Sequence, residues 1–208
     1  LLAWANERAR WVIEDDYDSE FHYGTGTIPA LRGLDGGNRV IYVGTFARTL
    51  SPELRLGYIV VPPALRETFR AMKWLADRGS SPIGQRALAV LMQSGTYERA
   101  QRRMARSLGE RRRIVLSALQ SCFSKKHDVR WYGSGAHVFL AFPSLAPDDA
   151  EPLVAEGLRH GVRMYSASRH HLLPPEHAAL LGGFASLTND EIERGIERLA
   201  AAYRSLGG

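Results

Sequence analysis

The sequence predicts an α/β fold, a mostly parallel sheet with helices on both faces, followed by a small α+β subdomain. Three observations predict it. Short β-branched, apolar runs alternate with longer helical patterns over the first hundred residues. These runs are continuously apolar, which is typical of strands covered on both faces. Beyond residue 121 the pattern changes to an alternating hairpin, a helix and further strands. We therefore expect two domains, 1–100 and 101–208.

In the first domain, the β-branched runs and the turn residues around them define the elements. The expected strands cover 11–13, 39–44 and 56–61, and the expected helices cover 1–10, 64–78 and 83–94. Strand 11–13 stops where a run of acidic residues begins. The segment between the first two strands is rich in glycine, which predicts a loop with at most a turn of helix.

A long amphipathic helix is expected over 97–121, because its apolar residues recur on one helical face. We expect it to link the two domains. The strands expected after it cover 129–132, 137–142, 162–165 and 182–187, with a helix over 148–160 between the second and third of them. Thr188 followed by Glu191 predicts a capping box at the start of the C-terminal helix.

The composition excludes several classes of protein. The 208 residues are 45% apolar, 24% charged and 9% aromatic, which rules out disorder, collagen and coiled coil. The longest uncharged apolar run, 56–65, is too short to span a bilayer. A single cysteine, Cys122, excludes an intrachain disulfide and fits a reducing compartment. The start of the chain shows no secretory pattern, so we expect a cytoplasmic protein.

Charge and motifs narrow the function further. The net charge of +5 is too diffuse to favour nucleic-acid binding. Seven of the fifteen residues over 99–113 are Arg, but they surround an apolar stripe, which favours a solvated helix face. Phosphate-loop, dinucleotide-binding and nucleophile-elbow patterns do not occur. The seven His are scattered, so we predict no metal site.

Two polar segments remain to be explained. Five of the seven residues over 14–20 are acidic, and 45–55 joins the second and third strands with a hydroxyl and two guanidiniums. Ligands of open α/β sheets bind outside the carboxyl ends of the strands, where both segments lie. Such groups suit an anionic ligand that carries a basic ring nitrogen. On composition alone, a helix-capping acid cluster with surface arginines stays an open alternative.

The segments 12–21, 28–31 and 40–58 resemble the aminotransferase-like domain of MocR-type regulators, a branch of the GntR transcription factors. Residues 161–165 and 183–199 also match the C-terminal pattern of that family, so the resemblance covers nearly the whole chain. It implies the type I fold of aminotransferases that depend on pyridoxal 5′-phosphate (PLP). Residues 1–100 would then form the C-terminal part of the large PLP-binding domain, and 101–208 the small C-terminal subdomain.

The same resemblance implies a role for four residues of the cofactor site. Asp15 would pair with the pyridine nitrogen and keep it protonated, so that the ring can accept electrons. Tyr17 would hydrogen-bond to the 3-oxygen of the ring. Thr45 and Arg55 match groups that contact the phosphate.

Position 48 departs from the family pattern, which has the lysine that forms an imine with the cofactor. Here the position holds Arg48, whose guanidinium stays protonated and cannot form an imine. We therefore expect PLP to bind non-covalently, with Arg48 among its contacts, and we assign no catalytic residue. The arginine that grips substrate carboxylates in this fold is also missing over 172–185, with only Arg169 just upstream.

These observations predict an effector-sensing module of a transcriptional regulator. The resemblance implies a homodimer, a small-molecule amine or amino-acid effector, and DNA contact only through a winged helix outside this chain. The chain opens in mid-pattern, so we expect it to be a piece of a longer protein. An aminotransferase acting on amino acids, present as a fragment or a substituted form, is the alternative, and a non-functional remnant with exposed sheet faces is a third.

Overall fold

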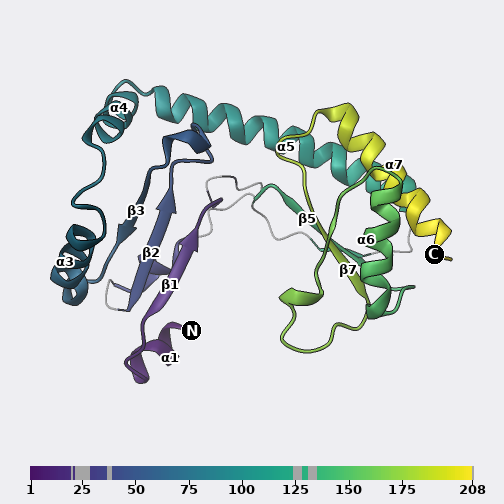
Figure 1. Cartoon of the computed structure of the whole chain (residues 1–208), viewed down its shortest axis with the longest axis horizontal. Coiled ribbons are helices and arrows are strands. Elements are labelled where there is room, and N and C mark those ends of the chain that lie inside the picture. The colour runs from purple at the N-terminus through teal and green to yellow at the C-terminus, as the bar shows by residue number, and fades with distance from the viewer. Residues whose placement is uncertain (20, 22–28, 37–38, 124–127, 131–134, 208) are drawn as a thin grey trace. The chain divides into compact units, whose positions relative to one another are not determined.

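The computed structural model describes residues 1–19, 21, 29–36, 39–123, 128–130 and 135–207. The chain divides into two compact units, Leu1–Ala105 and Arg106–Gly208, which are described separately below (Figure 1). The assignment of 1–100 and 101–208 to a large cofactor domain and a small subdomain stays a prediction.

The first unit is built on a three-stranded sheet with the order β1-β2-β3 (Figure 1). Strand β2 runs parallel to β1 and antiparallel to β3. The strands are β1 (Val12–Asp16), β2 (Val40–Thr45) and β3 (Gly57–Val60). The helices are α1 (Leu2–Glu7), α2 (Leu31–Leu34), α3 (Arg66–Asp77), α4 (Pro82–Gln93) and the start of α5 (Thr96–Phe123), with 3-10 turns η1 (Pro52–Leu54) and η2 (Pro63–Leu65).

The sheet differs from the sequence-based expectation in two respects. Strand β1 continues through the acidic residues to Asp16, because their backbone still pairs across to β2. Strand β3 is exposed at all four of its residues, and Ile13 is 70% exposed, so the described residues do not cover these strands on both faces. The antiparallel direction of β3 follows from its short connection to β2, because a parallel neighbour would need a longer crossover.

The second unit has a four-stranded sheet with the order β4-β5-β7-β6, and every neighbouring pair is antiparallel. The strands are β4 (Asp128–Arg130), β5 (His137–Phe142), β6 (Tyr165–Ser166) and β7 (Ala178–Gly183). The helices are the rest of α5, α6 (Ala150–Arg159) and α7 (Asn189–Ser205), with 3-10 turns η3 (Pro147–Asp149) and η4 (Ser168–His170). Residues 131 and 132, the end of an expected strand, lie outside the described residues.

The last strand begins and ends four residues before the expected span of 182–187. Gly182 and Gly183 end β7 rather than open it, because the buried run before them pairs with β5. A Cβ at Gly182 would lie 2.6 Å from the sulfur of Met164, so the side chain of Met164 needs the bare backbone there. Strand β6 covers only Tyr165–Ser166 and overlaps the expected span of 162–165 at one residue.

Apolar burial holds the second unit together. Phe123, Phe142 and Tyr203 are buried and form a cluster with ring centroids 5.3 to 5.8 Å apart. The apolar face predicted for α5 is confirmed, since Leu108 and Leu119 are at most 2% exposed. No helix in the described part of the chain combines the length and the apolar character that crossing a membrane requires.

The start of α7 confirms the predicted capping box. The side chain of Thr188 accepts a hydrogen bond from the backbone N–H of Glu191, and the Glu191 carboxylate accepts one from the backbone N–H of Thr188. Helix α7 contributes six buried residues to the core of the unit, so the order of its first turn matters for the whole unit.

Replacing this cap provides a test of stability. Thr188→Ala removes the side-chain acceptor and should lower the free energy of unfolding by about 1 kcal/mol. Thr188→Ser keeps the oxygen and should stay within a few tenths of a kcal/mol of the parent. Chemical denaturation of the two variants beside the parent measures the difference. Equal losses in both variants would show that the hydroxyl does not cap α7.

Candidate functional site

The acidic residues of β1 divide between the two faces of the sheet. Successive side chains of a strand point to opposite faces, so Glu14 and Asp16 lie on one face and Asp15 on the other. The Glu14 carboxylate accepts hydrogen bonds from the backbone N–H groups of Leu31 and Arg32, at 2.6 and 2.8 Å. It thereby caps the start of α2 and ties that helix to β1.

Asp16 is held by a network that reaches the next strand. Its carboxylate accepts hydrogen bonds from the hydroxyl of Tyr42 at 2.6 Å and from the hydroxyl and backbone N–H of Ser19. Partial burial raises the pKa of Asp16, but the hydrogen bonds from Ser19 and Tyr42 outweigh this effect and leave it below its usual value. Burial, together with hydrogen bonds to Asp16 and Tyr58, raises the pKa of Tyr42.

Asp15 differs from both neighbouring acids. Its side chain is exposed, and none of the described residues forms a hydrogen bond or ion pair with its carboxylate. It pairs in register with Val43 of β2, and Thr45, two residues further along β2, lies on the same face. Of the acids in β1, Asp15 is therefore the one left to contact a ligand.

The loop after β2 closes on the start of β3. The hydroxyl of Thr45 accepts a hydrogen bond from the N–H of Ala47 at 3.2 Å and lies 3.5 Å from the carbonyl oxygen of Leu56. The N–H of Phe46 donates to the same carbonyl at 3.1 Å. Because β3 is antiparallel to β2, Arg55 precedes β3 at the sheet end where β1 and β2 finish. Arg55 has the left-handed φ of 48°, which ends the turn η1.

Arg48 and Tyr17 bring the loops after β1 and β2 together. The guanidinium carbon of Arg48 lies 5.4 Å from the centre of the Tyr17 ring, within the range of a cation–π contact. Both side chains are exposed. The structure thus gathers Asp15, Tyr17, Thr45, Arg48 and Arg55 at one end of a three-stranded sheet, with direct contact between Tyr17 and Arg48.

Because Gly44 has no side chain, the aromatic rings on its face of the sheet, the face opposite Asp15, pack closely. A Cβ at Gly44 would overlap the ring of Tyr58. The ring of Tyr58 lies 5.9 Å from that of Tyr42 and 5.1 Å from that of Phe46, between centroids. Tyr58 thereby reaches the hydroxyl of Tyr42, which in turn binds Asp16.

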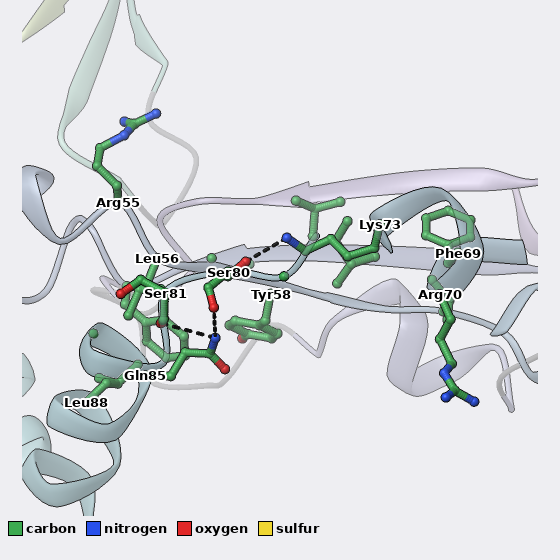
Figure 2. Close-up of a pocket in the computed structure, with 18 of the residues that line it drawn as sticks. Arg55, Leu56, Tyr58, Phe69, Arg70, Lys73, Ser80, Ser81, Gln85 and Leu88 are labelled. Carbon is green, nitrogen blue, oxygen red and sulfur yellow. Dashed lines mark hydrogen bonds between the residues drawn. The ribbon is translucent and has the colours of Figure 1, made fainter. Parts of the chain in front are cut away.

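A large cavity of the first unit borders the same end of the sheet. It has a volume of about 1550 Å³ and is bounded by β2, β3, α3 and α4, with Val43, the register partner of Asp15, in its lining. Its lining is largely apolar, and Lys73 and Gln85 donate hydrogen bonds to Ser80 and Ser81 along its rim (Figure 2). Of the predicted site residues it includes Arg55, whose side chain points away from the other labelled residues (Figure 2).

Sequence reasoning missed the roles of Glu14, Asp16 and Tyr42. It treated the acids as a group that follows the strand, although their period-two alternation could have separated Asp15 from the other two. Arg169, a candidate for carboxylate binding, lies exposed in η4 of the second unit. The described residues hold no group of three or more His, Cys, Asp or Glu side chains arranged to bind a metal.

The first unit thus has a mixed sheet with polar side chains at the carboxyl ends of its two parallel strands, and the second is an antiparallel α+β unit. In open α/β sheets, ligands bind at this end of the strands. The family model described as aminotransferase class I and II matches residues 1–199, and the chain belongs to this family.

Solved structures agree with this assignment. The α-aminoadipate aminotransferase LysN of Thermus thermophilus, crystallised with N-(5′-phosphopyridoxyl)-L-leucine, superposes with a TM-score of 0.83 and 26% identity. That match covers 99% of this chain and 53% of LysN. The kynurenine aminotransferase of Pyrococcus horikoshii, 23% identical, has the same fold, with a TM-score of 0.88 over 99% of this chain and 50% of its own.

Curated relatives include transcriptional regulators. The uncharacterized HTH-type transcriptional regulator YhdI of Bacillus subtilis is 34% identical, over 99% of this chain and 44% of its own length. The probable rhizopine catabolism regulatory protein MocR of Rhizobium meliloti is 33% identical, over 99% and 41%. The chain therefore spans less than half the length of these two regulators.

The hydrogen bond between Asp16 and Tyr42 predicts a pH dependence. Because the pKa of Asp16 is depressed in the folded state, its stabilising effect is present above the ordinary value of 3.8 and is lost as the pH falls through the folded pKa. Tyr42→Phe should raise the pKa of Asp16 and start this loss at a higher pH. Carboxyl NMR titration and acid unfolding measure both effects. Tyr17→Phe, which touches a different residue, should change neither.

Proposed function

We propose that this chain is the C-terminal, effector-sensing module of a MocR-type transcriptional regulator and that it binds PLP without a covalent bond. The support for a regulator comes from the curated relatives, which match almost the whole of this chain. The observation that carries the cofactor proposal is the exposed carboxylate of Asp15, which has no partner among the described residues, beside two carboxylates with structural partners.

The residue types at this end of the sheet match the chemical groups of PLP. Asp15 supplies an acceptor for a protonated ring nitrogen, and Tyr17 a phenol for the ring 3-oxygen. Thr45 and Arg55 supply a hydroxyl and a cation for the phosphate. When bound, PLP supplies an electron-accepting ring. The contribution of these residues is to hold and orient the ring and its phosphate.

Position 48 makes a regulator a better interpretation than an enzyme. Arg48 cannot replace a lysine as an imine-forming amine or as a neutral proton carrier. The aminotransferase alternative therefore needs a proton-transferring group that we do not find among the predicted site residues. Turnover of an amino acid by the protein with PLP would favour the enzyme.

The rest of the proposal concerns partners. We propose an amine or amino-acid effector, a homodimer, and DNA contact through a winged helix that is not in this chain, all in the cytoplasm. The HTH-type regulators among the relatives support the DNA-binding part. Their greater length leaves room for such a domain.

Asp15 provides the test of the cofactor site. Asp15→Asn in the complete gene product removes the charge opposite the ring nitrogen and should weaken PLP binding by about tenfold or more, because charge-assisted hydrogen bonds are the stronger ones. Thermal stability should not change, since the side chain has no partner among the described residues. Equilibrium titration with PLP measures the affinity. Asp16→Asn is the matched control, and it should lower stability through the loss of a charged acceptor for Tyr42.

The regulatory proposal is tested on DNA. The complete gene product should protect a site upstream of its own or a neighbouring gene, and addition of PLP should change its affinity for that site by about fivefold or more, the range of typical coupling between sites. Footprinting with and without PLP measures this. Asp15→Asn should keep the DNA contact and lose the response to PLP. DNA binding that ignores PLP in the parent would argue against an effector-sensing role.

A further inference from the structure

Arg48 places a permanent positive charge beside Tyr17. Its guanidinium carbon lies 5.4 Å from the centre of the Tyr17 ring. The side chain is exposed, and no carboxylate of the described residues forms an ion pair with it. Within the described part of the chain its charge is therefore not neutralised by a carboxylate, and it acts on a ligand that approaches Tyr17.

Together with the proposed function, this geometry indicates which part of the ligand the charge of Arg48 would act on. Tyr17 is the proposed partner of the ring 3-oxygen of PLP. The ring carbon adjacent to the one that bears this oxygen carries the substituent in which the phosphorylated B6 compounds differ: an aldehyde in PLP, an alcohol in pyridoxine 5′-phosphate and an amine in pyridoxamine 5′-phosphate. With Tyr17 at the 3-oxygen, a guanidinium 5.4 Å from the centre of its ring would lie near this substituent. The aldehyde and the alcohol are neutral oxygen acceptors, whereas the amine is an ammonium ion at neutral pH.

We infer that Arg48 makes the site select its ligand by the charge of this substituent. The guanidinium donates hydrogen bonds to an aldehyde or alcohol oxygen and has no acceptor for an ammonium group, which it repels. The site then accepts the oxygen forms of phosphorylated B6 and rejects the amine form. Because no covalent bond forms, it does not distinguish the aldehyde from the alcohol.

The inference rests on the proposed function and is tested by comparing three ligands. The complete gene product is titrated calorimetrically with PLP, pyridoxine 5′-phosphate and pyridoxamine 5′-phosphate. We expect the first two to bind with affinities within about threefold of each other, and the amine form to bind about tenfold more weakly or worse, since two like charges meet near the protein surface.

Two variants separate charge from shape. Arg48→Gln keeps a hydrogen-bond donor and removes the charge, so the amine form should recover to within about threefold of the alcohol form. Arg48→Lys keeps the charge and adds an amine, so the aldehyde alone should gain affinity and should become attached to the chain after borohydride reduction, as mass spectrometry detects. Arg78→Gln is the matched control, because Arg78 lies over the ring of Trp74 at 5.7 Å in a similar exposed pair.

The outcomes distinguish this inference from the function on which it rests. Equal binding of all three ligands to the parent, or tightest binding of the amine form, would overturn selection by charge and leave the B6 site in place. An unchanged preference in Arg48→Gln would also overturn it. Binding of none of the three ligands would overturn the proposed function itself. A melting temperature equal to that of the parent verifies that each variant is folded.

Discussion

The hydrogen bond between the Asp16 carboxylate and the Tyr42 hydroxyl, 2.6 Å long, ties β1 to β2 at the end of the sheet where the candidate site lies. Together with the two bonds from Glu14 to the start of α2, it fixes which face of β1 carries which acid. A shift of the strand by one residue would exchange the faces and leave Asp15 on the side of α2. The position of the proposed ligand contact therefore depends on acids that do not contact the ligand.

The contribution of the hydrogen bond between Asp16 and Tyr42 to the free energy of folding is moderate. Hydrogen bonds to a charged group contribute about 1.5–3 kcal/mol, and the partial exposure of Asp16 reduces its share to about 1 kcal/mol. Register is also specified by the buried Val40 and Ile41, so the hydrogen bonds refine a pairing that apolar burial already favours. The side chains of the candidate site are therefore positioned both by apolar burial and by hydrogen bonds.

Much of this arrangement could be predicted from the sequence, because its signals are local. The capping box at Thr188 and the apolar face of α5 depend on residues three or four positions apart, and both are confirmed. The limits of β7 were not predictable in the same way, since they depend on pairing with β5 and on the room that Met164 needs. The contacts of Glu14 with α2 and of Asp16 with β2 join residues at least 17 positions apart, beyond the reach of local patterns.

Gly44 connects the packing of the aromatic rings with the hydrogen bonds that hold Asp16. The ring of Tyr58 occupies the space that any side chain at position 44 would need. The hydroxyl of Tyr58 forms a hydrogen bond with the hydroxyl of Tyr42, which in turn donates to Asp16. A larger residue there would push the ring away and disturb the Asp16 carboxylate on the neighbouring strand β1. Natural variation at position 44 should accordingly be rare wherever the tyrosines at 42 and 58 are both kept, so the three positions should change together across related sequences.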